Sequence, residues 1–312
     1  MNDFAQSLNL RVQDYIELRQ SLGYIFRKQA GTLRAFLRYV QHHDDPGPLN
    51  RDLALRFVVS ESGGSNFHAR RYGVLRHFAE YLAIYDCRTE SLDRRALPRR
   101  RAAAPARILT DAELIALIEA TASLSRLGPL RAQTMETLVG LLASTGLRSG
   151  EALRLDRADV DLNDGVLLVR RTKFRKDRIV PVHITTLAAL RAYGCERDKV
   201  FSAQRDESFF VGPRGCRLST ATFHTDFRRI CHIAGLDDGS VSSPRPHDLR
   251  HRFAVTRLAE WHRQNADVQG VLPLLATYLG HVRYSDTAYY VTGTAELLEL
   301  ASQRAFNGEG GV

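Results

Sequence analysis

Several residue types are scarce in this chain of 312 residues, and each scarcity argues against a class of protein. The four cysteines are scattered and form no Cys-x-x-Cys pair, which argues against a zinc site and against a disulfide framework. No apolar run reaches the roughly 18 residues that a membrane span needs. The first residues lack a basic stretch followed by an apolar one, so we expect no signal peptide and a cytoplasmic protein.

Lysine is also rare. Of the 44 basic residues only Lys28, Lys173, Lys176 and Lys199 are lysines, so 40 are arginines. Arginine stays charged and binds phosphate through paired N–H groups, whereas lysine can release a proton. A lysine retained in such a chain is a candidate for a proton-transferring group. Genomic base composition is the alternative explanation of the arginine excess, and it says nothing about these four positions.

The overall charge indicates a polyanionic partner. The net charge is +9 and the isoelectric point is near 9.6, values typical of nucleic-acid-binding proteins. A hydrophobic content of 44% and a charged content of 25% are those of a globular protein with a buried core. The length suits two domains.

Residues 1–93 have the pattern of a small all-helical domain. In Thr32–His43 the apolar residues recur with the i, i+3, i+4, i+7 spacing of one helix face, and Leu75–Leu82 repeats this spacing. Fainter helical patterns cover Ser7–Ser21 and Asp52–Glu61, which gives four short helices. The last of them carries Arg70, Arg71 and Arg76 on its predicted polar side. Such a side is either simply solvated or lies against DNA phosphates.

Residues 94–107 read RRALPRRRAAAPAR, which predicts an extended basic linker. Arg99, Arg100 and Arg101 lie at its centre and are candidate DNA contacts. A second domain, residues 108–312, opens with the capping-box pattern Thr110–Glu113. A linker of this charge suits a protein that closes around a duplex.

The second domain is predicted to be mainly helical with one small sheet. Two β-type runs, Val166–Arg170 and Ile179–Val182, flank a basic turn and predict a hairpin. Lys173, Arg175 and Lys176 lie in this turn. The predicted helices of the domain are Leu130–Ser144, Thr185–Tyr193, Ser219–Ala234, His247–His262, Asp267–Leu279 and Ala295–Ala305.

Four residues between positions 246 and 290 form a candidate site for a phosphodiester. His247 and Arg250 leave the same face at the start of a predicted helix, where the N–H groups and the helix dipole favour an anion. His281 follows Gly280, a helix C-cap signal, and Tyr290 comes nine residues later. Each of these residues alone has an ordinary structural explanation, as a surface, capping or packing side chain.

Together these motifs resemble those of the tyrosine recombinases, also called phage-integrase-type or Xer-like recombinases. The family's Gly-Leu-Arg-x-Gly-Glu segment matches residues 146–151 and carries Arg148. Its hairpin lysine matches Lys173, and its His-x-x-Arg box matches His247 and Arg250. Its Leu-Gly-His box supplies His281, and the spacing selects Tyr290 over Tyr289 as the nucleophile.

The resemblance implies a fold and a reaction. It implies a SAM-like, four-helix core-binding domain followed by a catalytic domain for DNA breaking and rejoining. Tyr290 would form a 3′-phosphotyrosyl link while Arg148 and Arg250 bind the phosphate oxygens. His247 would accept the tyrosine proton, Lys173 would protonate the leaving oxygen, and His281 would donate a hydrogen bond to the phosphate. Neither a metal, ATP nor another cofactor is then required.

The neighbours of these residues have more modest predicted roles. Lys176 competes with Lys173 for the role of acid, although a contact with a DNA phosphate suits it better. Glu151 is expected to orient the local turn or an arginine, and Asp248 and His251 are expected to be structural.

The resemblance also implies partners and leaves alternatives open. The partner would be double-stranded DNA at specific recombination sites, bound by a homotetramer with or without partner recombinases. The long segment 261–273, which contains a proline, is typical of integrases encoded by transposons and other mobile elements. A type IB topoisomerase and a non-catalytic architectural DNA-binding protein are the two alternatives.

Overall fold

In the computed structural model the chain divides into two compact units, Met1–Ala104 and Pro105–Val312. The structure describes residues 3–98, 106–170, 177–202, 206–237, 239, 242–281 and 287. The division falls inside the predicted linker, residues 94–107. Ala96 and Leu97 still pack against the core of the first unit. Arg107 already belongs to the second unit, where its Nη2 donates to Glu113 Oε1 at 2.5 Å. The bounds of the linker stay a prediction.

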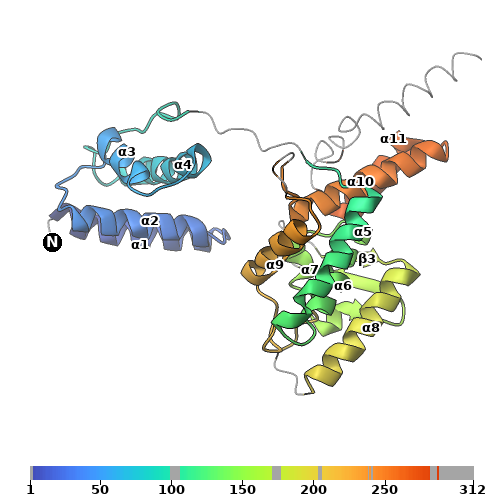
Figure 1. The fold of residues 1–312 in the computed structure, drawn as a ribbon. Coiled ribbons are helices and arrows are strands. Elements are labelled where there is room, and N and C mark those ends of the chain that lie inside the picture. Colours follow the sequence, from blue (N-terminus) through green and yellow to red (C-terminus); the bar gives the residue numbers. More distant parts are fainter. Residues whose placement is uncertain are drawn as a thin grey trace, which may run out of the picture. The chain divides into compact units, whose positions relative to one another are not determined.

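The described part of the first unit contains four helices, as the sequence predicts. They are α1 (Asp3–Ser21), α2 (Arg27–His42), α3 (Arg51–Val59) and α4 (Ser65–Leu82). Helices α3 and α4 pack against the layer formed by α1 and α2 (Figure 1). Helices α1 and α2 begin earlier than predicted because their first turns already bury Phe4 and Ala30 in the core. The rings of Phe36 and Phe57, whose centroids lie 5.1 Å apart, join α2 to α3 inside this core.

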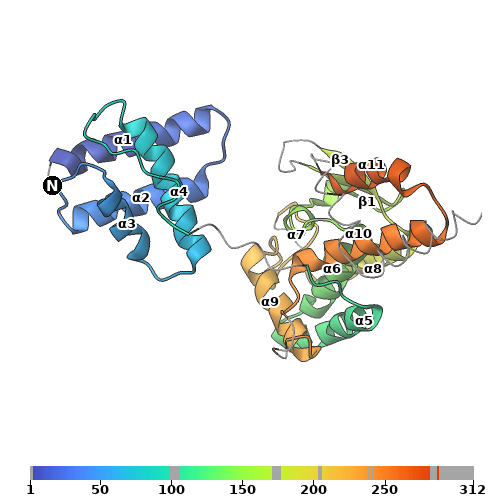
Figure 2. The same ribbon diagram turned by 90° about the horizontal axis from the view of Figure 1, so that it is seen from above.

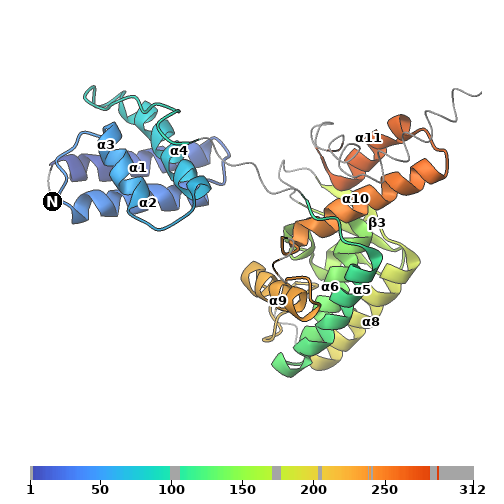
Figure 3. The ribbon, with the colours of Figure 1, turned by 45° about the horizontal axis from the view of Figure 1, so that its top comes forward.

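The second unit is built around α6 (Arg131–Thr145), which buries most of its circumference. The elements in contact with α6 are α5 (Asp111–Glu119), η1 (Ala120–Leu127), α7 (Ser149–Ala152), α8 (Ile184–Val200), α9 (Thr220–Ile233) and α10 (Pro246–Arg263). Helix α10 packs against α6, and α11 (Val268–Leu279) packs on α10 and against β3 (Arg178–Pro181) of the sheet (Figures 2 and 3). This packing brings the C-terminal ends of α6 and α11 to the N-terminal end of α10.

The small sheet contains the predicted hairpin. Strands β1 (Val160–Asp161), β2 (Val166–Val169) and β3 (Arg178–Pro181) form an antiparallel sheet in the order β1-β2-β3. The short element η2 (Arg157–Asp159) leads into β1. Strand β1 was not predicted because two residues are too few to show an alternating pattern. Val169 pairs with Arg178, and this pair is the last one in the ladder before the turn.

The sequence signals at Thr110 and Gly280 are confirmed. Thr110 and Glu113 form a complete capping box at the start of α5, and the side chain of Ser219 caps α9. Gly280 ends α11 with a φ of 70°, in the left-handed region that favours glycine.

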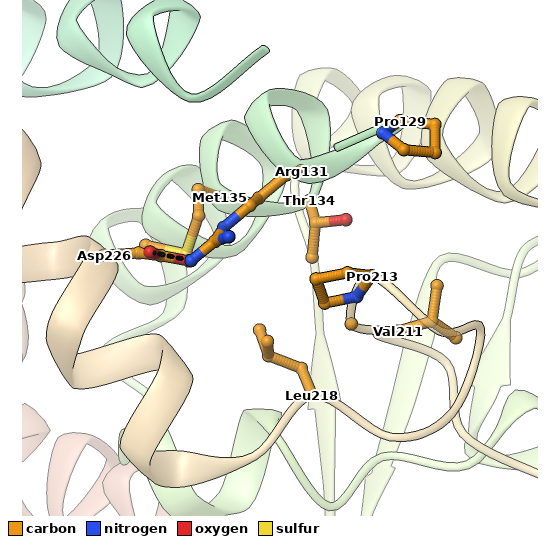
Figure 4. A pocket seen from close by; sticks show the side chains of 9 residues that line it. Pro129, Arg131, Thr134, Met135, Val211, Pro213, Leu218 and Asp226 are labelled. Carbon is orange, nitrogen blue, oxygen red and sulfur yellow. Dashed lines mark hydrogen bonds and ion pairs between the residues drawn. The ribbon is translucent and has the colours of Figure 1, made fainter. Parts of the chain in front are cut away.

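An ion pair joins the start of α6 to α9. Arg131 Nε and Nη2 donate to the two carboxylate oxygens of Asp226 at 2.9 and 2.5 Å (Figure 4). These hydrogen bonds raise the pKa of Arg131. The cavity beside the pair, which Pro213 and Leu218 help to line, has a volume of about 10 Å³. It has room for about one water molecule, so it is no ligand site.

Candidate active site

Arg148 lies where the chain leaves α6. The helix ends at Gly146, whose φ is 63° and whose Cα faces the ring of Phe253; a Cβ there would lie 2.6 Å from that ring. Arg148 then begins α7, and its Nη1 donates to Glu151 Oε1 at 2.9 Å. Its backbone N–H donates to Glu151 Oε2 at 3.1 Å. The predicted role of Glu151, orienting an arginine in this turn, is confirmed.

Glu151 has a second arginine partner that the sequence did not reveal. Arg178, from β3, donates from Nη2 to Glu151 Oε2 at 2.8 Å and from Nη1 to Oε1 at 3.2 Å. Burial by itself would raise the pKa of this carboxyl group. The hydrogen bonds and charges of Arg178, followed by the hydrogen bonds from Arg148, outweigh burial and lower the pKa to about 2. Glu151, on the short helix α7, is therefore a carboxylate that binds the guanidinium groups of both Arg148 and Arg178.

Arg250 reaches the same place from α10. Its side chain is 1% exposed, and it donates from Nη1 to the Gly146 carbonyl and from Nη2 to the Leu279 carbonyl, both at 2.8 Å. Asp248 accepts from the backbone N–H of Arg245 at 2.7 Å and closes the first turn of α10. The predicted structural role of Asp248 is thereby confirmed.

The C-terminal end of α11 is where the arginines converge. Three successive carbonyl groups there each accept a hydrogen bond from a different arginine. Tyr278 O accepts from Arg178 Nε at 2.9 Å. Leu279 O accepts from Arg250, and Gly280 O accepts from Arg148 Nη2 at 3.4 Å. Arg148 and Arg250, 102 positions apart in the sequence, are thus brought to adjacent peptide groups directly before His281.

His281 is oriented by a residue that the sequence analysis missed. Its Nδ1 lies 2.7 Å from Thr287 Oγ1, and Thr287 is fully buried. Thr287 lies three positions before Tyr290, so His281 contacts a residue that is close in the sequence to the predicted nucleophile. A threonine near a tyrosine is too common to be a sequence signal, and only the contact reveals it.

His247 lies at the first turn of α10 with its ring edge-to-face against His251, at 4.7 Å between centroids. Although its side chain reaches solvent, the pKa of His247 is lowered to about 4. Loss of hydration is the main cause, and the charges of His251, Arg250 and Arg148 add to it. His247 is therefore neutral at pH 7 and able to accept a proton.

The remaining residues of the predicted site fall outside the described residues. These are Lys173, Arg175 and Lys176 in the hairpin turn, and Tyr290 with its neighbour Tyr289. The turn leaves the sheet after the Val169–Arg178 pair. The same holds for Arg99, Arg100 and Arg101 of the predicted linker.

The three predicted DNA contacts of α4 lie in different environments in the structure. Arg70 is exposed and lines a groove of about 720 Å³ in the first unit, together with Arg19, Lys28 and His77. Arg76 pairs with Glu80 at 2.5 Å.

The prediction that Arg71 lies on the polar side of α4 is wrong. Its guanidinium carbon lies 4.0 Å from the centroid of the Phe57 ring, and its Nη1 pairs with Glu61 at 2.9 Å. The side chain is buried because Arg71 shares a helix face with the core residues Leu75 and Phe78, four and seven positions later. Burial lowers the pKa of Arg71.

Two features are absent from the part of the chain that the structure describes. It contains no group of three or more His, Cys, Asp or Glu side chains placed to hold a metal ion. No helix among these residues is both long enough and apolar enough to cross a membrane.

Comparison with known proteins places this arrangement in a family. The model of the phage integrase family matches residues 107–296. The chain is 59% identical over 306 residues to "Putative integrase/recombinase y4rE" of Sinorhizobium fredii (strain NBRC 101917 / NGR234), a match that covers 98% of each protein. It is 30% identical to tyrosine recombinase XerA of Thermococcus kodakarensis, over 89% of this chain and 90% of the other. The solved structure of the Tn1549 transposon integrase in complex with transposon right end DNA has a similar fold. Its TM-score is 0.64 at 15% identity, covering 95% of this chain and 98% of that one.

The chain belongs to the phage integrase family, the tyrosine recombinases, which are enzymes that cut and rejoin DNA. The family and the mainly helical fold with a small sheet, both predicted from sequence, are confirmed. The SAM-like character of the first unit stays a prediction.

Proposed function

We propose that the protein is a site-specific DNA recombinase that cuts each strand through a covalent bond between Tyr290 and a 3′-phosphate. The observation that carries the proposal is the convergence of Arg148 and Arg250 on adjacent carbonyls directly before His281. Two guanidinium groups and an imidazole in one place suit the two non-bridging oxygens of a phosphodiester. Family membership supports the same reaction.

In the proposed cleavage step the Tyr290 oxygen attacks phosphorus, and the bond from phosphorus to the 5′-oxygen breaks. His247 accepts the phenolic proton, since its pKa of about 4 leaves the imidazole unprotonated at pH 7. Lys173 delivers a proton to the leaving 5′-oxygen, because an arginine holds its protons too tightly for this role. The reverse reaction, in which a 5′-hydroxyl from another strand attacks the phosphotyrosine, would rejoin the DNA.

This chemistry needs neither ATP nor a metal. The phosphotyrosyl bond preserves the free energy of the phosphodiester, and the arginines supply the positive charge that a metal supplies elsewhere. We propose specific duplex sites as partners, held by four copies of the chain with or without partner recombinases. Arg70 and the basic groove of the first unit would contact the DNA phosphates. The similarity to a transposon integrase favours a role in mobile-element movement.

A covalent-trapping experiment tests the proposal. Nicked duplexes tiled across the DNA that flanks the gene are incubated with the protein in EDTA, and protein–DNA adducts are separated on denaturing gels. We expect an adduct from the wild type and from Tyr289→Phe, and none from Tyr290→Phe. No wild-type adduct on any duplex, or an equal adduct from Tyr290→Phe, would refute the mechanism. Relaxation of plasmids that lack any trapped site would instead indicate a topoisomerase.

A further inference from the structure

Arg107, at the last position of the predicted linker, joins the two ends of the loop that precedes α10. Its Nη1 donates to the Leu236 carbonyl at 3.0 Å and to the Ser242 carbonyl at 3.2 Å. Leu236 comes three residues after the end of α9, and Ser242 comes four residues before the start of α10. One guanidinium group, on a side chain that is 14% exposed, therefore holds the chain on both sides of this loop.

The other end of the guanidinium is held by α5. Arg107 Nη2 donates to Glu113 Oε1 at 2.5 Å, and Glu113 Oε2 accepts from the Thr110 backbone N–H at 2.8 Å. Burial raises the pKa of Glu113, but the hydrogen bonds from Thr110 and Arg107 outweigh burial and lower it. Glu113 is thus a carboxylate, and because it belongs to the capping box of α5, it fixes the direction of the Arg107 side chain.

Helix α10 also binds the residues that follow Arg107. Arg252 donates from Nε to the Leu109 carbonyl at 3.0 Å, and its Nη2 pairs with Asp111. Between these two anchors, the side chain of Ile108 packs against the core cluster that α10 and α11 share. Residues 107–111, here called the connecting segment, are therefore attached both to α10 and to the chain just before it.

We infer that Arg107 is a positioning residue, which sets where α10 begins and therefore where His247 lies. This inference rests on the proposed function, in which His247 accepts the proton of the nucleophile. The contact with Ser242 is the direct route, and the contacts of the connecting segment with α10 support it.

The path from Ser242 to His247 is short. Five positions separate the two residues. Within this stretch the Arg245 backbone N–H donates to Asp248, which is fully buried, so the first turn of α10 is closed and a displacement of Ser242 reaches it directly. Arg250 is held in addition by two carbonyl groups at the far end of its side chain. We therefore expect His247 to depend on Arg107 more than Arg250 does.

The forked shape of the guanidinium is essential to this role. Nη1 binds two carbonyl groups while Nη2 binds a carboxylate, so one planar group joins three acceptors. An ammonium group is a point charge on a flexible stem and does not fix these directions at once. Arg107→Lys should therefore keep the charge beside Glu113 but lose part of the alignment, whereas Arg107→Ala should lose both.

The first experiment needs no cleavage. The imidazole of His247, assigned with His247→Gln, is titrated in ¹H–¹³C spectra of the free protein and of its variants Arg107→Ala and Arg107→Lys. Loss of hydration is the main cause of the low pKa of His247, so a loosened first turn admits water and raises the midpoint. We expect a midpoint above the wild-type value of about 4 in Arg107→Ala and a smaller rise in Arg107→Lys.

Two variants in the same unit serve as matched controls. Arg191→Ala is the control for Arg107→Ala, because Arg191 Nε also donates to a backbone carbonyl, at 2.7 Å. Arg131→Lys is the control for Arg107→Lys, because it replaces the fork of an ion pair between α6 and α9. Both controls should keep the wild-type midpoint of His247. A midpoint in both Arg107 variants that equals those of the controls would overturn the inference.

The second experiment measures the rate of adduct formation at saturating DNA. Because a misplacement of about 1 Å costs about 100-fold, we expect a smaller displacement in Arg107→Ala to cost about tenfold. Arg107→Lys should lie between Arg107→Ala and the wild type, and the two controls should match the wild type. A wild-type rate at saturation combined with weaker DNA binding would mean that Arg107 contacts DNA instead, and it would overturn the inference. If the wild type itself formed no adduct, the proposed function would fail, while the titration would still decide whether Arg107 positions His247.

Discussion

Glu151 and Arg178 form a two-point ion pair across 27 residues of sequence, with both carboxylate oxygens within 3.2 Å of the guanidinium nitrogens. Glu151 is 3% exposed, so the pair is screened little by water. The same carboxylate holds Arg148, and its state of ionisation therefore affects both the stability of the second unit and the geometry of the candidate site.

The first prediction concerns stability at acid pH. Glu151 has a folded-state pKa of about 2, below its ordinary value of 4.5. Its contribution to the free energy of unfolding is therefore complete above pH 4.5 and is lost as the pH falls towards 2. The loss amounts to about 3 kcal/mol. Glu151→Gln should remove this pH dependence and cost a similar amount, about 3 kcal/mol, at pH 7. Urea unfolding followed by the fluorescence of Trp261, the only tryptophan, reports on the second unit. Glu136→Gln, at an exposed site on α6, is the control. The same dependence of the unfolding free energy on pH in the two variants would contradict the prediction.

The second prediction concerns the end of α11. Gly280→Ala places a Cβ at a φ of 70°, which costs about 1–2 kcal/mol, and also pushes that Cβ against Arg178. Gly235 has a φ of 69° with nothing within 4 Å of its Cβ position, so Gly235→Ala measures the backbone strain alone. We expect Gly280→Ala to be the more destabilising of the two by about 1 kcal/mol. Thermal unfolding of the two variants measures the difference. Equal losses of stability in the two variants would mean that Arg178 moves aside without cost.

The third prediction concerns His247. Its pKa of about 4 means that the unfolded chain binds the proton more tightly, so this histidine makes the fold less stable as the pH falls from 6.5 towards 4. In ¹H–¹³C spectra of the free protein we expect its imidazole to titrate near pH 4. Replacement of Arg148 by glutamine should raise the midpoint, because one of the nearby positive charges is removed. A wild-type midpoint at or above 6.5 would be incompatible with this environment.

The fourth prediction concerns Thr287. Thr287→Val keeps the shape of the side chain but removes the hydroxyl that lies 2.7 Å from His281 Nδ1. Without this partner the ring is less well fixed, and we expect the rate of adduct formation to fall by about tenfold. Thr185→Val is the matched control, since it removes a similar contact, 2.9 Å to His183 Nδ1, at the start of α8. Equal rates for Thr287→Val and the control would show that the contact does not serve the reaction.

Local signals made much of the fold predictable. The capping box at Thr110, the cap at Ser219 and the glycine that ends α11 each depend on residues within one or two helical turns. The hairpin was predictable for the same reason, because its two strands are close in sequence.

Long-range contacts limited the prediction of the site. The sequence motifs predicted Arg148, Arg250 and His281 as site residues, and the structure brings them together. The position of Arg178 became visible only when Glu151 and Tyr278, 27 and 100 positions away, were seen to bind it. Arg71 was misassigned for a related reason. A charged residue beside polar neighbours suggested a surface position, whereas an aromatic ring and a glutamate from other segments accommodate it in the first unit.

The three carbonyl groups at the end of α11 have an electrostatic consequence. A helix C-terminus carries roughly half a negative charge, spread over its last carbonyl oxygens. Arg148, Arg178 and Arg250 each donate to one of these oxygens, so the helix acts as a built-in counter-ion for a cluster of like charges. The cluster can therefore stay assembled before any nucleic acid arrives. In the proposed reaction, an incoming phosphate would meet cations that already donate hydrogen bonds to protein carbonyl groups.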